Sequence, residues 1–476
     1  MNKKSVEKYI ISLVILVGIV VFAFWFFHNP VKDFRTSVPG LDNRAAKDTA
    51  STEKIVIGEK FKEYSTIKTE LTGKWPRFRG TDIDNINKEK IKLIDSWGKQ
   101  GPKILWKVDL GDGHAAPAIY NGKVYLLDYD ERKKSDALRC FSLETGAELW
   151  RRSYSVNLKR NHGMSRTIPA ITDKYVVTIG PRCQVMCSNP NNGDLLWGID
   201  LAKDFKTEVP LWYTGQCPLI DDDIAIIAPG GSALMMGVDC ATGKVLWQTP
   251  NPDNWKMSHS SIIPMTFEGK KMYIYCAIGG MCGISAQGSD KGKILWKTTE
   301  FSPSVVAPSP LILDNGKIFM TAGYGAGAIL IQLVKQNDAF SVKVLQHYKP
   351  SLGIASEQQT AILFNHHIFI IQPKDAAATR NQFFCSSTTD CKKILWTSSK
   401  SERFGLGPYI LADGKFFILS DDGTLYIAKA DVEKFTLLDK AKIMDGQDAW
   451  GPIAIADGRL LLRDSKQMVC IDIRKN

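Results

Sequence analysis

Residues 237–247 read GVDCATGKVLW, and variants of this string recur along the chain. Six of them end in a similar apolar run, and the tryptophans of these runs are Trp106, Trp150, Trp197, Trp247, Trp296 and Trp396. Successive tryptophans are 44, 47, 50, 49 and 100 residues apart. Because the last spacing is twice the period, we expect one repeat to have lost its tryptophan, at Val344-Leu345-Gln346. A period of about 40–50 residues is typical of propeller blades.

Two further markers share this period. Short apolar runs begin near Pro117, Pro169, Pro218, Pro310, Pro408 and Pro452, and Ser261 with Ile262 and Thr360 with Ala361 fill the two gaps, which makes eight starts. Turns at Gly146, Gly193, Gly243 and Gly292 precede tryptophan runs, as expected for tight hairpins. Hairpin signals also occur at Asn121-Gly122, Asn315-Gly316, Asp413-Gly414 and Asp457-Gly458. Each unit therefore predicts about four antiparallel strands.

The two ends of the repeat region complete each other. Residues 449–476 supply three strands without a tryptophan run, whereas residues 101–110, GPKILWKVDL, supply a tryptophan run without preceding strands. Together they make an eighth blade, which leaves no open sheet edge at the junction. The sequence predicts an all-β fold, an eight-bladed β-propeller of four-stranded antiparallel blades closed by both chain ends. The tryptophans are expected to pack between blades.

The N-terminus predicts a membrane anchor. Residues 10–27, IISLVILVGIVVFAFWFF, carry no charge and would span roughly 27 Å as a helix, close to the thickness of a bilayer core. Lys3, Lys4 and Lys8 precede them and favour a cytoplasmic N-terminus. We expect a cytoplasmic tail (1–9), a transmembrane signal anchor (10–27), an extracytoplasmic linker without regular structure (28–73) and the propeller (74–476). A cleaved signal peptide is the alternative, although its apolar core is usually shorter and ends in small residues.

Composition narrows the function classes. The chain has 476 residues, of which 44% are hydrophobic and 23% charged, values that exclude a disordered chain, a collagen-like fibre and a polytopic membrane protein. The net charge of +11 is modest for this length and favours solubility over a specific anionic partner. No Ser-His-Asp order, P-loop or paired-carboxylate motif supports a hydrolase or kinase. Nucleic-acid binding is not expected in a translocated domain without basic clusters.

The repeat resembles a known family. GVDCATGKVLW is similar to the blades of quinoprotein-like propellers, named after pyrroloquinoline quinone (PQQ), and the resemblance covers about residues 75–476. WPRFRGTDIDNI, which begins at Trp75, resembles the WPxFRG lead-in of an envelope-associated branch. Residues 209–231 and 320–333 also look like that branch. The superfamily includes alcohol and sugar dehydrogenases and an outer-membrane assembly scaffold, so the resemblance implies either an oxidoreductase or a scaffold.

The dehydrogenases of this superfamily imply a set of residues that can be sought. They typically carry two adjacent cysteines, Glu and Asn ligands for calcium, an Asp base and an indole beneath the quinone. None of the ten cysteines here are adjacent, no acidic cluster has calcium spacing, and no CxxCH haem motif occurs. We therefore predict no cofactor, with PQQ and calcium as the alternative.

The cysteines are expected to be mainly buried thiols. Cys140 and Cys187 both lie six residues before a turn glycine, an inward position on a blade. Cys385 and Cys391 bracket SSTTD in a probable hairpin and are the best candidates for a disulfide in an extracytoplasmic domain. No zinc pattern is present.

Loops that enter the inner strands converge on the central channel of a propeller, where ligands bind. The residues that we expect to ring this mouth are His114, His162, Arg166, Trp212, Gln216, His259, Gln358 and Trp450. Arg166 offers a fixed cation, unless neighbouring carbonyls satisfy it. The three histidines come from blades one, two and four and need not converge, so no metal site and no catalytic residue is predicted.

These patterns predict a membrane-anchored, extracytoplasmic or periplasmic propeller that acts as a binding or protein-interaction scaffold. Its partner is expected to be a protein of the cell envelope. The alternative function is a PQQ-dependent oxidoreductase acting on alcohols or sugars.

Overall fold

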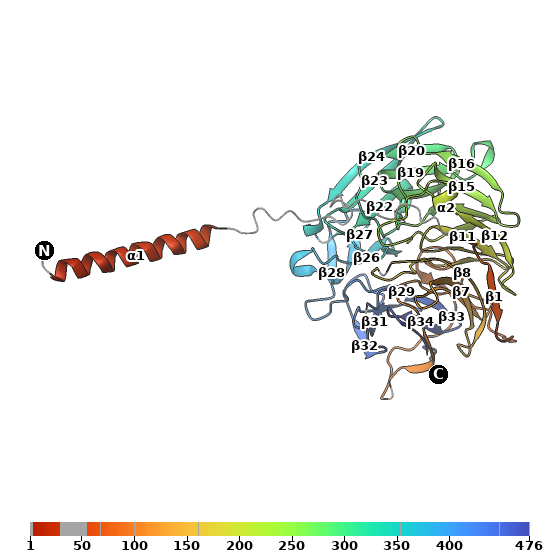
Figure 1. Ribbon diagram of the computed structural model, residues 1–476, viewed down its shortest axis with the longest axis horizontal. Coiled ribbons are helices and arrows are strands. Elements are labelled where there is room, and N and C mark those ends of the chain that lie inside the picture. Colours follow the sequence, from red (N-terminus) through yellow and green to blue (C-terminus); the bar gives the residue numbers. More distant parts are fainter. Residues whose placement is uncertain are drawn as a thin grey trace. The chain divides into compact units, whose positions relative to one another are not determined.

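The computed structural model describes residues 3–28, 55–66, 68–99, 101–159, 161–352, 354–446 and 448–475 (Figure 1). The chain divides into two compact units, residues 1–47 and residues 48–476. The first contains α1 (Lys3–Phe27), within which Lys8–Phe27 is long and apolar enough to cross a membrane. The expected apolar helix is therefore confirmed, but a signal sequence passes the same test, so the anchor itself stays a prediction.

The second unit is an eight-bladed β-propeller, as predicted, and each blade is one sheet. Blade 1 contains β5 (Ala118–Tyr120), β6 (Lys123–Asp130), β7 (Ser135–Ser142) and β8 (Glu148–Ser155). Blade 2 contains β9 (Ala170–Ile171), β10 (Val176–Ile179), β11 (Gln184–Ser188) and β12 (Leu195–Asp200), followed by α2 (Leu201–Asp204). Blade 3 contains β13 (Leu219–Asp221), β14 (Ile224–Ile227), β15 (Ala233–Asp239) and β16 (Val245–Pro250). Blade 4 contains β17 (Ile263–Phe267), β18 (Lys270–Ala277), β19 (Gly280–Ser285), η1 (Gly288–Asp290) and β20 (Ile294–Thr298).

The second half of the ring repeats this pattern. Blade 5 contains β21 (Leu311–Ile312), η2 (Asp314–Gly316), β22 (Lys317–Ala322), β23 (Gly327–Gln336) and β24 (Ala339–Tyr348), followed by η3 (Pro350–Leu352). Blade 6 contains β25 (Ile362–Phe364), β26 (His367–Ile371), η4 (Ala377–Thr379), β27 (Phe383–Ser387) and β28 (Ile394–Thr397). Blade 7 contains β29 (Tyr409–Ala412), β30 (Lys415–Leu419), β31 (Thr424–Lys429) and β32 (Leu437–Lys442). Blade 8 contains β33 (Ala454–Ala456), β34 (Arg459–Arg463), β35 (Gln467–Asp472) and β4 (Lys103–Asp109).

The first strand of each blade lies innermost. β5 contacts both β9 and β33, and β9 contacts β13, so the first strands of neighbouring blades surround the central channel. The fourth strands lie toward the other edge of each sheet, and six of them carry the tryptophans. β24 lacks a tryptophan, as expected, and β32 of blade 7 lacks one as well. The segment before each first strand therefore opens at one end of the channel, which we call the mouth.

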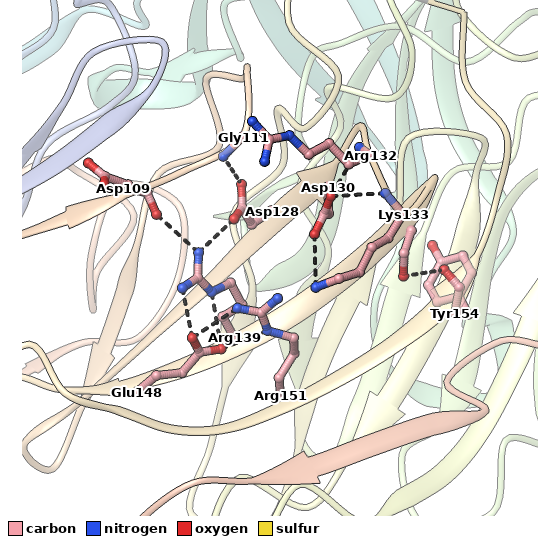
Figure 2. A network of polar contacts seen from close by, with 11 residues as sticks. Asp109, Gly111, Asp128, Asp130, Arg132, Lys133, Arg139, Glu148, Arg151 and Tyr154 are labelled. Atoms are coloured by element: carbon pink, nitrogen blue, oxygen red, sulfur yellow. Dashed lines mark hydrogen bonds and ion pairs between the residues drawn. The ribbon is translucent and has the colours of Figure 1, made fainter.

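Both chain ends close the ring, as the orphan tryptophan run predicts. β4 pairs antiparallel with β35 and places Trp106 opposite Cys470. A buried ion-pair network then joins this blade to blade 1 (Figure 2). The Arg139 guanidinium donates to the Asp128 carboxylate at 2.7 Å and to the Asp109 carbonyl at the end of β4 at 3.3 Å. Glu148 accepts from Arg139 at 2.7 Å and from Arg151 at 2.7 Å, which holds the arginine in place.

The tryptophans fill the seams between blades. The Trp106 indole is only 8% exposed and donates to the Leu143 carbonyl of blade 1 at 2.9 Å. A Cβ added to Gly146, which follows in the same turn, would lie 2.7 Å from this indole. The turn glycine therefore serves two needs, because it adopts a φ of 72° and leaves room for the ring of the preceding blade. Trp150, Trp197 and Trp247 meet Gly193, Gly243 and Gly292 in the same way.

Three short strands before the repeats extend the sheets. β1 (Lys60–Glu63) adds to the outer edge of blade 1 by pairing with β8, although residues 28–73 were expected to lack regular structure. All four of its residues are exposed, so no apolar pattern marks the strand. β1 forms because it pairs with the open edge of β8. Its Phe61 ring adds contacts, since it lies 6.5 Å from the Trp150 ring and beneath the Arg152 guanidinium.

The lead-in that begins at Trp75 enters the channel from the end opposite the mouth. β2 (Lys74–Trp75) pairs with β5 of blade 1, and β3 (Ile86–Asn87) pairs in parallel with β29 of blade 7. Arg79, between them, is buried and donates to the carbonyls of Thr360 and Ala361 at 3.0 and 2.9 Å. Arg77 donates to the Ile220 carbonyl of blade 3 at 3.1 Å. The lead-in therefore binds the inner strands of several blades.

All ten cysteines are buried free thiols. This confirms the inward positions of Cys140 and Cys187. The disulfide expected between Cys385 and Cys391 is wrong, because the two side chains belong to different apolar clusters on either side of blade 6. Burial raises the pKa of the Cys385 thiol to about 12, which keeps it protonated and unreactive.

Candidate functional site: the channel mouth

Three predicted mouth residues from blades 8, 1 and 2 form one aromatic stack. The His114 imidazole, which is 3% exposed, lies against the Trp450 indole with ring centroids 3.5 Å apart and planes inclined by 17°. The exposed His162 ring lies 5.8 Å from the same indole and 5.7 Å from His114. Burial, together with the positive charge of Arg166, lowers the pKa of His114 far below its ordinary value, so its imidazole is neutral.

Arg166 connects this stack to blade 3. Its Nε donates to the Trp212 carbonyl at 2.6 Å, and its Nη2 donates to the His162 carbonyl. The guanidinium carbon lies 5.8 Å from the centroid of the Trp450 ring, within the range of a cation–π contact. Burial lowers the pKa of Arg166 to about 10, so the side chain stays cationic at neutral pH. Neighbouring carbonyls therefore satisfy part of this cation, and its charge remains in the mouth.

A second aromatic group lies on blades 3, 4 and 5. Trp212 is half-buried and stacks on the His259 ring at 6.1 Å and on the Tyr324 ring at 5.7 Å. Burial lowers the pKa of His259 to about 3. Leu211, next to Trp212, leaves 53% of its surface exposed. The two groups place aromatic rings from most of the blades around one charged arginine.

Sequence reasoning missed Tyr324 and its neighbours. Tyr324 lies in the turn between β22 and β23, which returns to the mouth because consecutive strands are antiparallel. Lys374 lies 5.4 Å above the Tyr324 ring and 3.0 Å from the buried Glu357 carboxylate. The glycine-rich string GYGAGA around Tyr324 was the available signal, since such a turn follows the second strand of a blade.

One predicted mouth residue points away from the mouth. Gln216 is completely buried beneath the mouth, where it donates to the Ala228 carbonyl and the Tyr275 hydroxyl and accepts from the Ala228 amide. It therefore holds blades 3 and 4 together. Gln358 is half-buried, whereas its neighbour Gln359 donates to the Trp450 carbonyl at 3.0 Å.

Two of the three histidines converge, with a carboxylate that the sequence did not single out. The ligand atoms of His114, His162 and Asp448 all lie within 4.8 Å of one another. His259 is separate from this group and stacks on Trp212 instead. Among the described residues, this group of two histidines and one aspartate has a spacing that suits a metal ion.

The histidine and aspartate group at the mouth is not a calcium ligand set. Calcium takes six to eight oxygen ligands, whereas this group offers two imidazoles and one carboxylate. An indole that supports a quinone also needs a free face, and one face of the Trp450 ring is covered by His114 at 3.5 Å.

The comparisons with known proteins concern the fold. Residues 133–352, from just before β7 to η3, match the family model described as outer membrane protein assembly factor BamB. This part of the chain is therefore similar to that family. No curated protein matches the chain.

Solved structures share the propeller fold of this chain. BamB from Moraxella catarrhalis superposes with a TM-score of 0.52 at 10% sequence identity, over 78% of this chain and 100% of that one. A europium-containing methanol dehydrogenase superposes with a TM-score of 0.53 at 12% identity, over 84% of this chain and 89% of that one. At such identities the likeness concerns the fold, and function has to be argued from the site.

Proposed function

We propose that this protein is a non-enzymatic binding scaffold that presents its channel mouth to a protein partner. The observation that carries the proposal is the composition of the mouth, where Trp212, Tyr324 and Arg166 lie together beside the exposed Leu211. Aromatic residues and arginine dominate the binding energy of protein interfaces. Stacking fixes these rings before a partner arrives, which lowers the entropy cost of binding.

The proposal extends to location. The apolar helix Lys8–Phe27 would anchor the protein, and the lysines before it would keep the N-terminus in the cytoplasm. The propeller would then act outside the cytoplasm, with a partner in the cell envelope. The match of residues 133–352 to a family model described as an outer membrane protein assembly factor supports the scaffold role.

Capture of the partner in intact cells tests the proposal. The full-length double variant Arg166→Ala with Trp212→Ala should lose a crosslinked partner that the wild-type protein retains. The matched control replaces an exposed lysine in the turn between β15 and β16, at the end opposite the mouth, and an exposed leucine of β16, Lys244→Ala with Leu246→Ala, and should capture the partner normally. Both variants need to melt close to the wild-type temperature. Capture by the mouth variant at the wild-type level would contradict the proposal.

The oxidoreductase alternative makes the opposite prediction. Purified protein supplied with PQQ and Ca²⁺ would then oxidise alcohols or sugars in a dye-linked assay. We expect no turnover above the background, because the two imidazoles and one carboxylate that meet at the mouth are not a calcium ligand set, and His114 covers one face of Trp450.

A further inference from the structure

We propose that His114, His162 and Asp448 form a binding site for a divalent transition-metal ion at the mouth. Their ligand atoms lie within 4.8 Å of one another, and His162 Nε2 lies 3.8 Å from Asp448 Oδ2. The three residues come from three loops that the ring closure brings together, those before β5, β9 and β33. His114 is buried while His162 and Asp448 are exposed, so the group has a fixed floor and an open side through which an ion can enter.

The three side chains are held in place before any ion binds. Trp450 stacks on both imidazoles. The loops of His114 and His162 are joined because the His114 amide donates to the Ser165 carbonyl at 2.7 Å. The Trp450 amide donates to the Asp448 carbonyl at 2.8 Å, which fixes the third loop to the same stack. Ligands supported in this way need little rearrangement to close around an ion.

The surroundings of His114 leave its imidazole available. Its Nδ1 is buried and has no hydrogen-bond partner within the described part of the chain. A Cβ added to Gly163, directly after His162, would lie 2.8 Å from His114 Nε2. Gly163 has a φ of 74°, so a side chain is disfavoured there, and this nitrogen stays open.

The donor set decides the class of ion. Two imidazole nitrogens and one carboxylate oxygen suit Zn²⁺, Co²⁺, Ni²⁺ or Cu²⁺, whereas Ca²⁺ and Mg²⁺ prefer oxygen ligands throughout. Three protein ligands leave a coordination position for water or for another molecule. The positive charges of Arg166 and Arg463 lie near His114 and repel a dication. We therefore expect that all three ligands are needed for the ion to bind. The site does not depend on the proposed partner.

Titration of the full-length protein with Co²⁺ tests the site. The protein, purified in detergent without a polyhistidine tag and freed of metal by a chelator, should bind one Co²⁺ per chain with a visible absorption band that Zn²⁺ abolishes. His162→Ala and Asp448→Asn should each weaken Co²⁺ binding by at least tenfold. The matched control is His366→Ala, which removes an exposed imidazole that lies 2.8 Å from an Asp314 carboxylate oxygen. It should leave the Co²⁺ titration unchanged.

Melting temperatures provide a second measurement, because a ligand that binds only the folded state raises its stability. Zn²⁺ should raise the melting temperature of the wild-type protein and of His366→Ala, and should leave those of His162→Ala and Asp448→Asn unchanged. The replaced side chains are exposed, so all three variants should fold without metal. Absence of stoichiometric Co²⁺ binding by the wild-type protein would overturn the proposal. Binding that persists undiminished in both mouth variants would also overturn it.

Discussion

Replacement of Trp106 by alanine tests the closure of the ring. Trp106 lies on β4, the strand from before the repeats that completes blade 8, and its indole fills the seam toward blade 1. The substitution removes this ring and leaves the Leu143 carbonyl without its donor. Because β4 supplies the fourth strand of blade 8, the damage falls on the blade that closes the ring.

The size of the effect follows from the burial of the indole. An indole of this exposure withdraws about 150–250 Å² from water, which at about 25 cal/mol per Å² amounts to about 4–6 kcal/mol as an upper value. Replacement of buried tryptophan by alanine typically costs about 3–5 kcal/mol. For a domain of about 400 residues this lowers the melting temperature by about 4–6 °C.

The assay is a thermal melt of the full-length protein, with two companion variants. Trp106→Phe keeps an aromatic ring but loses the hydrogen bond to Leu143, so we expect a smaller loss, of about 1 kcal/mol for the bond and a further loss for the reduced packing. Lys107→Ala changes an exposed residue of the same strand and should stay within about 0.5 kcal/mol of the wild type. If Trp106→Ala melts together with Lys107→Ala, the seam does not depend on the indole and our reasoning is refuted.

Three further predictions follow from the charges and from the N-terminus. Arg139→Ala should lower the free energy of unfolding by about 3–5 kcal/mol in a thermal melt, because it leaves the buried Asp128 carboxylate without its cation. A loss below about 1 kcal/mol would show that the Arg139–Asp128 ion pair does not stabilise this part of the propeller. Burial raises the pKa of Asp136, which accepts from the Tyr154 hydroxyl, to about 7. Stability from the protonated carboxyl is therefore lost as the pH rises from about 4 through about 7, and Asp136→Asn should gain up to about 4 kcal/mol relative to the wild type between pH 4 and 8; equal pH profiles would show that the carboxyl is not buried. Finally, the protein should fractionate with membranes and keep its N-terminus, whereas a new N-terminus near residue 28 in mass spectrometry would show a cleaved signal peptide.

The repeat predicted most of the fold because its markers report local chemistry. Glycine turns, hairpin signals and tryptophan runs each fix one piece of a blade, and the orphan run around Trp106 fixes the closure. β1 was not predictable in this way, since its four exposed residues owe their conformation to the edge of β8. The disulfide considered between Cys385 and Cys391 is absent for a related reason. Closeness in sequence does not show on which side of a blade a thiol lies.

The mouth was predicted in part. Residues before the first strands converge because every blade enters the channel from the same end, which correctly placed His114, Arg166, Trp212 and Trp450 near one another. Side-chain direction within a loop is set by tertiary packing, so Gln216 turned inward. The same reasoning overlooked two residues. Tyr324 returns to the mouth in the turn between β22 and β23, and Asp448 lies two residues before Trp450.

Site-specific photo-crosslinking in intact cells tests the scaffold function most directly. A photoreactive residue at position 211 lies beside Trp212 at the rim of the mouth, and the same residue at position 246, where the leucine is 48% exposed on β16, serves as the control. We predict a discrete adduct with one envelope protein from position 211, none from position 246, and loss of the adduct in the Arg166→Ala, Trp212→Ala background. Absence of an adduct at position 211, or equal labelling at both positions, would contradict a binding function of the mouth.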